Sequence, residues 1–498
     1  MLENEDAPLA VAKLSLPYKL RYMAATLDWA LQVAGLNGAS AGEANQLRLA
    51  LEETLSFLIN SYHDAEPWEL ICVDFTLKND NIAEFCIANE GPPIHQERIP
   101  RYDPQDGSGS DMDGLWYFVA LKAVDDIKFN NLGNRGWQVV ITKRLEQGLG
   151  GEATAPQAHA SGTGTTPAFT VRYAKPEDAG ELIDITYDTY RYTHPNEVFY
   201  HESRLAEAIA KEEIIFTVVE SGGTIACTDS ISVLPYAPGC GYVGALMSRR
   251  AYRKTRAVLH LLNENKRYME SNPLGLDLYT STTVTAHTGS QKAGEKIGFK
   301  PSGLFLNEGS VINFRNMRAT DGIRESFVVY VYISKKPTLE TMYLPEAHHD
   351  VVRPILAHMG CEATLSAECC KELPADTVLD VKTMSIEKSA QVTLVQIGKD
   401  WAESLRRKFF TLRGEGIQAI TVLVPAFRPL PENLDGEMAR LNGLFTGLTP
   451  LSTSDYYLVY CILNEPMDFD RIQVASPLMQ ALKEHIMQSY RQMSSELL

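Results

Sequence analysis

The sequence of 498 residues lacks any apolar run that approaches the roughly 20 residues needed to span a bilayer. Its first residues, MLENEDAPLA, are acidic and hold no basic segment leading into an apolar one, so we expect neither an export signal nor a membrane anchor. Positive charge is also scarce, because 63 acidic residues outnumber 46 basic ones and the formal net charge is -17. This balance disfavours binding to nucleic acid or to an anionic membrane.

The eight cysteines form no CxxC pair and show no spacing typical of metal ligands. Scattered cysteines of this kind are typical of reduced thiols in protein cores. The neighbouring His348, His349 and Asp350 do not indicate a metal site, because adjacent histidines on a helix point to different faces. We therefore predict a cytoplasmic protein that holds no metal.

The composition is that of a globular protein, with 45% apolar and 22% charged residues. At roughly 150 residues per domain, the length corresponds to about three domains. The segment 148–168 is built almost entirely from Gly, Ala, Thr, Ser and Pro, and is predicted to be a flexible linker. A second boundary follows Lys335, Lys336 and Pro337. The sequence predicts an α/β multidomain protein with domains at 1–147, 169–337 and 338–498.

Hydrophobic periodicity predicts mixed strands and helices in all three domains. In the first domain, helices are expected near 17–34, 43–62 and 114–125, and strands near 69–77, 82–88 and 136–144. In the second domain, strands are expected near 169–174, 214–220, 224–234, 240–248, 276–282 and 325–333, with helices from Pro176 and near 255–270 and 288–297. In the third domain, helices are expected near 346–359, 400–413 and 431–441, and strands near 378–386 and 390–397 and in QAITVLVPA and YYLVYCIL. The second and third domains share this order, which indicates an internal duplication, with chance similarity of two α/β segments as the alternative.

No acidic residue occurs between Asp229 and Glu264, although the average composition would place about four in that window. The window instead holds Arg249, Arg250, Arg253, Lys254 and Arg256. These residues lie between an expected strand and the start of an expected helix, where backbone N–H groups and the positive helix end point the same way. The pattern predicts a site for a phosphate-bearing ligand. A solvated basic patch is the alternative.

The run GYVGALMSRRAYRKTRAVLHLL, followed by TVTAHTGSQKAGEKIGF, resembles the GNAT acyltransferase family over about residues 170–335. The resemblance implies a splayed sheet that holds acetyl-CoA or another acyl-CoA. Backbone groups along the pantetheine would then be those of Ala245, Leu246, Met247 and Ser248. The pyrophosphate would meet the turn and helix start at Arg253, Lys254, Thr255, Arg256, Ala257 and Val258. A last helix would span Ser290 to Ile297, where Ser290 meets the ligand or caps the helix.

The sequence departs from the GNAT pattern at two places. Arg256 and Val258 stand where the family has small residues, so their side chains would crowd the phosphates, although Arg256 can instead supply a charge-assisted contact. Gly294 stands where a tyrosine often protonates the leaving thiolate. His287 is the nearest titratable candidate for a general acid or base, and a histidine that bonds its own loop is the alternative. In a GNAT site the thioester carbonyl would be polarised by a strand N–H, here that of Leu246 or Met247.

The runs LRLALEETLSFLINSYHD, CIANEGPPI and DGLWYFVALKAVDDIKFNNLGNRGWQVVITKRL together resemble the GHKL-type ATPase domain of anti-sigma-factor serine kinases. The match covers about residues 13–146, so the resemblance implies an α/β sandwich for the first domain. Glu53 of the first family box, Gly91 of the second and Gly114 of the third are retained.

Three positions of this nucleotide pattern are changed. Phe57 replaces an asparagine that helps to hold Mg²⁺, and an apolar ring cannot ligate a hard cation. Asn89 replaces an aspartate that binds the adenine amino group, and Trp116 fills the place of a glycine beside the phosphates. We expect a degenerate domain that binds ATP and Mg²⁺ poorly or not at all. Nucleotide binding through a modified pocket is the alternative.

The third domain resembles a degenerate second GNAT module that has no basic turn. Three functions follow from these resemblances. The first is a bacterial regulator that senses or uses acyl-CoA and meets a regulatory protein through its first domain. The second is an enzyme that transfers an acyl group from CoA to an amine. The third is a scaffold in which every domain is inactive.

Overall fold

A computed structural model describes residues 12–62, 65–66, 68–78, 81–95, 99, 102, 114–145, 169–253, 255–309, 324–385, 387–465 and 467–496. Its contacts divide the chain into two compact units. The first unit comprises Met1–Thr166, Ala179–Tyr187 and Asn196–Leu205, and the second comprises Pro167–Asp178, Asp188–Pro195 and Ala206–Leu498. The expected linker at 148–168 lies outside the described residues. The fold class is mixed α/β, as predicted.

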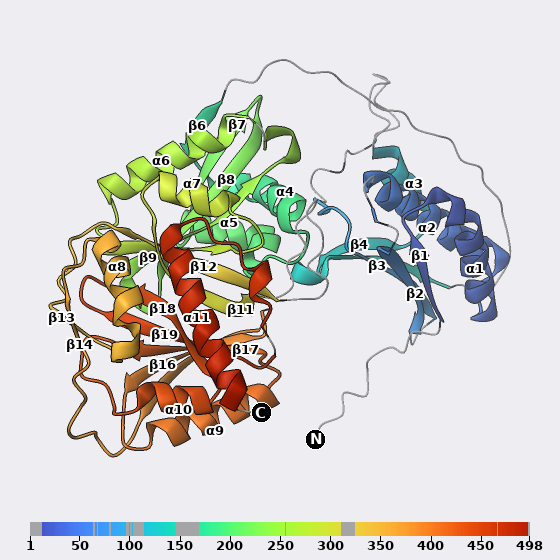
Figure 1. Ribbon diagram of the computed structural model, residues 1–498. Coiled ribbons are helices and arrows are strands. Elements are labelled where there is room, and N and C mark those ends of the chain that lie inside the picture. The colour runs from blue at the N-terminus through green and yellow to red at the C-terminus, as the bar shows by residue number, and fades with distance from the viewer. Residues whose placement is uncertain are drawn as a thin grey trace. The chain divides into compact units, whose positions relative to one another are not determined.

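The first unit contains a five-stranded antiparallel sheet in the order β1-β2-β3-β5-β4, accompanied by three helices (Figure 1). The strands are β1 (Ala12–Pro17), β2 (Leu70–Lys78), β3 (Ile82–Asn89), β4 (Asp126–Asn131) and β5 (Trp137–Arg144). The helices are α1 (Met23–Leu36), α2 (Ala41–Ser61) and α3 (Leu115–Ala123). The expected helix at 17–34 is corrected at its start, because AKLSLP pairs with β2 as a strand and α1 begins only at Met23.

One face of this sheet is buried. Ile71, Val73 and Phe75 alternate along β2 with half-buried residues, as expected for a strand that is covered on one side. The ring of Trp29 on α1 packs edge-on against Phe85 of β3, with 6.0 Å between the centroids. The helices therefore cover the apolar face of the sheet.

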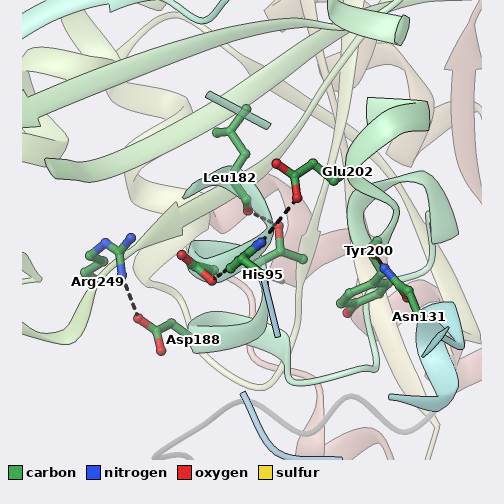
Figure 2. Close-up of polar contacts among 9 residues, drawn as sticks. His95, Asn131, Leu182, Asp188, Tyr200, Glu202 and Arg249 are labelled. Carbon is green, nitrogen blue, oxygen red and sulfur yellow. Dashed lines mark hydrogen bonds and ion pairs between the residues drawn. The ribbon is translucent and has the colours of Figure 1, made fainter. Parts of the chain in front are cut away.

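Two segments from beyond residue 168 belong to the same unit. They lie in α4 (Ala179–Tyr190) and around the start of α5 (Glu202–Ala210). His95 contacts both segments, because its Nε2 lies 2.9 Å from Asp184 Oδ1 and its Nδ1 lies 3.2 Å from Glu202 Oε2 (Figure 2). The predicted 169–337 domain thus contributes two segments to the first unit, and its boundaries stay predictions.

The second unit is built on one twelve-stranded sheet in the order β15-β16-β17-β19-β18-β11-β12-β10-β9-β8-β7-β6. Its first strands are β6 (Thr170–Tyr173), β7 (Ile215–Ser221), β8 (Thr224–Leu234), β9 (Ala237–Ser248), β10 (Leu278–Val284), β11 (Lys300–Gly309) and β12 (Glu325–Ile333). The others are β15 (Val378–Met384), β16 (Ser389–Gln396), β17 (Ala419–Pro425), β18 (Gly443–Pro450) and β19 (Tyr456–Ile462). The short strands β13 (Thr341–Tyr343) and β14 (Thr364–Ser366) form a separate parallel pair.

Helices follow the strands of this unit in a repeated order. They are α6 (Ala257–Ser271), α7 (Gly289–Lys296), α8 (His349–Met359), α9 (Trp401–Gly414), α10 (Leu434–Arg440) and α11 (Pro477–Glu496). The series β8, β9, α6, β10, α7, β11, β12 recurs as β15, β16, α9, β17, α10, β18, β19. In both series a helix connects two parallel strands, β9 with β10 and β16 with β17. The order expected for an internal duplication is therefore present.

The two series share one sheet and one core. β11 pairs antiparallel with β18 at Gly303 and Gly447, and a single buried cluster runs from Ile231 to Ile486. Helix α11 packs across this junction against β18 and β11 (Figure 1). The second half of the unit therefore completes the core of the first.

Two general features of the described chain bear on the expectations above. In these residues no helix is long and apolar enough to cross a membrane. All eight cysteines are free thiols, and four of them are buried.

Candidate functional site

The strands β9 and β10 separate within the sheet of the second unit. They pair in parallel only at Cys240, Gly241 and Tyr242, opposite 278–280. Within the described residues β9 continues beyond Tyr242 without pairing with β10, while β10 stays paired with β12 as far as Val284. We call the place where the two strands cease to pair the opening.

A bulge turns β9 at this opening. The register with β8 shifts between the pairs that end in Gly244 and Met247, and Ala245 has a φ of 54°, in the left-handed region. A bulge of this kind leaves backbone groups outside the ladder. Leu246 is 36% exposed, whereas Met247 is fully buried. The four residues expected along a pantetheine, from Ala245 to Ser248, thus form an irregular strand edge rather than a regular one.

The basic turn begins at Arg249, directly after the end of β9. Arg249 is anchored, because its Nε donates to Ile225 O at 2.9 Å and its Nη1 lies 3.4 Å from Asp188 Oδ2 (Figure 2). Arg253 is exposed and donates from Nε to Ser248 O at 3.2 Å. Arg249 therefore has a structural role in this turn, while the exposed guanidinium of Arg253 lies where the charge of a ligand would be met.

Helix α6 begins at Ala257, immediately after the turn. The Thr255 hydroxyl accepts a hydrogen bond from the Ala257 N–H at 3.2 Å. Arg256 is exposed, and Val258 is only partly buried. Arg256 directly precedes the positive end of α6, and the phosphate site expected from the window without acidic residues stays a prediction. Lys254 lies outside the described residues.

Two hydroxyl groups near the opening are buried without a hydrogen-bond partner in the described chain, Thr283 Oγ1 on β10 and Ser290 Oγ on α7. Ser290 is the second residue of α7, and the N-cap residue Thr288 makes no side-chain cap. Ser290 therefore does not cap the helix. A buried hydroxyl that lacks a partner costs free energy, which a ligand with amide groups would recover. These two groups fit a pantetheine chain, whereas Arg256 and Val258 leave less room for the phosphates than small residues would.

His287 lies in the loop before α7. Its Nδ1 accepts a hydrogen bond from the Gly289 N–H at 3.1 Å, so the ring bonds its own loop, which is the alternative stated above. A role in proton transfer stays a prediction. Gly294 lies inside α7, where it supplies no proton donor.

Sequence reasoning missed a second set of residues at the opening. The Tyr242 hydroxyl lies 2.9 Å from Thr282 Oγ1 and so connects β9 with β10 where they separate. Burial raises the pKa of Tyr242, and the charges of Glu308 and Glu387 act in the same direction. Burial also raises the pKa of Glu308 to about 7, with a further contribution from Glu387. No spacing in the sequence brings β9, β10 and β11 together, so no signal pointed to these residues.

A buried polar pair, Asp229 on β8 and Asn265 on α6, connects this helix to the sheet. Asn265 Nδ2 donates to Asp229 Oδ2, and burial raises the pKa of Asp229 to about 7. Asp229 Oδ1 and Asn265 Oδ1 have no other partner in the described chain. A protonated Asp229 would donate to Asn265 Oδ1 and satisfy both atoms. The residue that begins the window without acids is thus a carboxyl that keeps its proton at mildly acidic pH and loses it around pH 7.

The first unit places two of the changed nucleotide positions together. The rings of Phe57 and Trp116 stack with centroids 4.2 Å apart and planes 10° apart. This geometry is that of a stable aromatic pair. The two residues that the GHKL resemblance assigns to the positions for Mg²⁺ and phosphate therefore pack against each other, and that assignment stays a prediction.

The remaining nucleotide positions are partly occupied by internal contacts. Asn89 is buried, its Oδ1 accepts from the Gly91 N–H at 3.2 Å, and its Nδ2 donates to Trp137 O at 3.4 Å. Burial, with the charge of Glu52, raises the pKa of Glu53. Gly114 precedes α3 with a φ of -93°, a conformation open to other residues.

No family model and no curated protein matches the chain. Solved structures of N-acetyltransferases match about a third of it. One from Staphylococcus aureus Mu50 is 16% identical, with 34% of this chain and 99% of that chain covered and a TM-score of 0.28. The ribosomal-protein-S18-alanine N-acetyltransferase from Escherichia coli is 13% identical, with 34% and 95% covered and a TM-score of 0.27.

The PaiA N-acetyltransferase from Thermoplasma acidophilum, solved in complex with coenzyme A, is 15% identical, with 33% and 99% covered and a TM-score of 0.25. Similarities of this size carry no functional argument. The proposal below therefore rests on the geometry of β9, β10, α6 and α7.

Proposed function

We propose that the opening between β9 and β10 binds acyl-CoA and that the second unit transfers the acyl group to an amine. The observation that carries this proposal is the bulge at Ala245, which frees backbone groups of β9 where the strand leaves β10. The basic turn and the start of α6 follow within twelve residues of Ala245, so one continuous segment offers groups to an amide chain and then to phosphates.

Different residues of this chain would bind different parts of acyl-CoA. Thr283 and Ser290 offer unpartnered hydroxyls to the pantetheine amides, and Arg253 and Arg256 offer charge to the phosphates. Acyl-CoA supplies a thioester that an amine attacks. A backbone N–H of Leu246 or Met247 would stabilise the charge that develops on its carbonyl oxygen. Glu308 is our candidate to accept the amine proton, because its charge acts on Tyr242 where β9 and β10 separate and because burial raises its pKa to about 7.

In this proposal the first unit does not bind or hydrolyse a nucleotide. The stack of Phe57 on Trp116 and the internal bonds of Asn89 support that role. An acyl-CoA-responsive regulator that does not turn over is the second candidate, and the degenerate first unit favours it.

Titration calorimetry with acetyl-CoA tests binding. We expect Arg253→Gln and Arg256→Gln each to weaken binding by about tenfold, since each removes a charge-assisted contact. Arg267→Gln is the matched control, because Arg267 lies further along α6, away from its start, is exposed, and forms an ion pair with Glu264. Equal affinities in all three variants would contradict the site.

Release of free CoA thiol in the presence of a panel of amines tests turnover. Binding without turnover would support the regulator, and the absence of both would leave a scaffold. Glu308→Gln should reduce the rate while leaving acetyl-CoA affinity unchanged, and a variant as fast as the wild type would remove Glu308 from the proposal.

A further inference from the structure

A separate pocket of about 250 Å³ lies in the second half of the second unit. It is bounded by the residue after β13, the segment after β14 and the chain that leads into α10. Its walls are mostly aliphatic, and Leu344, Leu430 and Leu434 are buried side chains of the core. The pocket therefore has an apolar floor, and it is separate from the candidate site formed by β9, β10, α6 and α7.

The polar end of the pocket is the carboxyl group of Asp435. Its Oδ1 accepts a hydrogen bond from the Tyr460 hydroxyl at 2.6 Å and lies 3.1 Å from His348 Nε2. No hydrogen bond to Oδ2 is formed by the described residues, and the side chain is 37% exposed. One carboxylate oxygen is thus held in place, while the other has no hydrogen bond from the described residues, and Asp435 lines the pocket.

His348 is itself fixed from two directions. Its ring stacks on Phe445 with 4.0 Å between the centroids, and its Nδ1 lies 2.9 Å from His485 Nε2 on α11. A carboxylate only accepts, so His348 Nε2 carries the proton toward Asp435. The triad of Asp435, His348 and His485 therefore orients the carboxylate, in the way that supporting hydrogen bonds orient a binding group.

The charge of the pocket has one sign. Burial alone would raise the pKa of Asp435, but hydrogen bonds from His348 and Tyr460, together with the charges of His348 and His485, outweigh it and hold the pKa below its usual value. Burial, with the charge of His348, lowers the pKa of His485. Glu368 also lines the pocket, and no Lys or Arg does. His348 lies behind Asp435 and outside the lining, so the charged side chains that line the pocket, Glu368 and Asp435, both favour a cation.

We propose that this pocket binds a small organic cation, an ammonium head with an aliphatic stem of a few carbons. The head lies against Asp435 Oδ2, and the stem lies along Leu430 and Leu344. The volume falls below the range of roughly 300–1,000 Å³ that holds drug-sized ligands, so the pocket fits a small metabolite and excludes CoA. An anion would meet two carboxylates. No metal-binding group of three His, Cys, Asp or Glu side chains exists in the described chain.

The rate of alkylation at Cys369 can report whether the pocket is occupied, because this cysteine is exposed and lines the pocket. The full-length protein is alkylated with iodoacetamide, and the rate at Cys369 is followed by peptide mass spectrometry. We expect n-hexylamine to slow this rate at least about threefold, while 1-hexanol and hexanoate of equal chain length leave it unchanged. The rate at Cys370, which does not line the pocket, is the internal control.

Variants test the role of the carboxylate. Asp435→Asn should weaken protection by hexylamine at least about tenfold, because the ammonium loses its charged partner. Glu432→Gln, an exposed neighbour outside the lining, should leave protection intact. Ala367→Trp places a large ring at the exposed mouth of the pocket and should abolish protection in a protein whose core is unchanged.

The proposal is wrong if hexanol protects as well as hexylamine, if no amine protects the wild type, or if Asp435→Asn is protected like the wild type. Should Asp435→Asn fail to fold, Ala367→Trp decides, since protection that survives there places the amine elsewhere. None of these results depends on acyl-CoA binding, so a failure of the pocket proposal can be distinguished from a failure of the proposed function.

Discussion

Phe57 and Trp116 stack ring on ring, with 4.2 Å between their centroids. One residue lies on α2 and the other in the first turn of α3, so their contact joins the two helices over the apolar side of the sheet. In the GHKL resemblance these positions belong to an asparagine and a glycine, which would leave a space. The two substitutions fill that space together.

Nucleotide binding is the first property to test. We expect no binding of ATP with Mg²⁺ in titration calorimetry and no change in Trp116 fluorescence, because the stack closes the positions for metal and phosphate. Trp116→Phe keeps an aromatic stack but removes the indole signal, so it is the matched control for the fluorescence. Micromolar affinity for ATP would contradict this prediction.

The bond between Tyr242 and Thr282 tests the opening in the sheet. We expect Tyr242→Phe and Thr282→Val each to cost about 0.5–1.5 kcal/mol of unfolding free energy, and the double variant to cost less than the sum, since both remove one hydrogen bond. Chemical denaturation measures all three, with Tyr332→Phe as a control for loss of a tyrosine hydroxyl elsewhere. Strictly additive costs would show that the bond does not stabilise the fold.

Asp229 makes stability depend on pH. Its pKa of about 7 in the folded chain exceeds the value of about 3.9 in an unfolded chain, so the folded state binds more protons between these values. The contribution of Asp229 is therefore fully present at pH 4 and is lost as the pH rises through 7. An amide at this position has no proton to lose and can donate to Asn265 Oδ1 at any pH.

We expect Asp229→Asn to raise the unfolding free energy at pH 8 by about 1–3 kcal/mol and to change it little at pH 4.5. Thermal unfolding at the two pH values measures this difference. Glu213→Gln removes an exposed carboxylate and should show no such dependence on pH. A variant of Asp229 that is equally destabilised at both pH values would mean that the carboxyl is ionised in the folded protein.

The junction of β11 with β18 is sensitive to a single methyl group. Gly447 has a φ of 124°, and a Cβ there would lie 2.5 Å from Gly303 Cα and 2.7 Å from Ser302 O. We expect Gly447→Ala to cost more than about 2 kcal/mol, because backbone atoms on both sides cannot move away. Gly303→Ala should cost less, as its nearest contact would be 3.1 Å from Leu448 O. Denaturant unfolding compares the two, and equal stabilities would contradict the close approach.

Local patterns predicted most elements of both units. The apolar periodicity located α2, α6, α8 and α9, and the absence of acids marked the basic turn, because each of these features lies within one short stretch of chain. The strands β11 and β18 were missed. β18 reads GLFTGLTP, with two glycines and a proline, and forms a strand only because β19 and β11 pair with it on both sides.

The contacts that shape the sites could not be predicted in the same way. His348 meets Asp435 and His485, which are 87 and 137 residues further along the chain, and Tyr242 meets Thr282 at a distance of 40 residues. No spacing rule connects such positions. Pairs of this kind depend on strand order, which single-sequence patterns do not determine.

The pairing of β18 with β11 covers an edge of the sheet. Without residues 338–498, β11 would be a free edge strand of ten residues, and exposed edges promote aggregation. Residues 338–498 therefore keep this edge covered, whether or not they carry a ligand site of their own. We infer that covering this edge is a structural role that requires no chemistry from those residues.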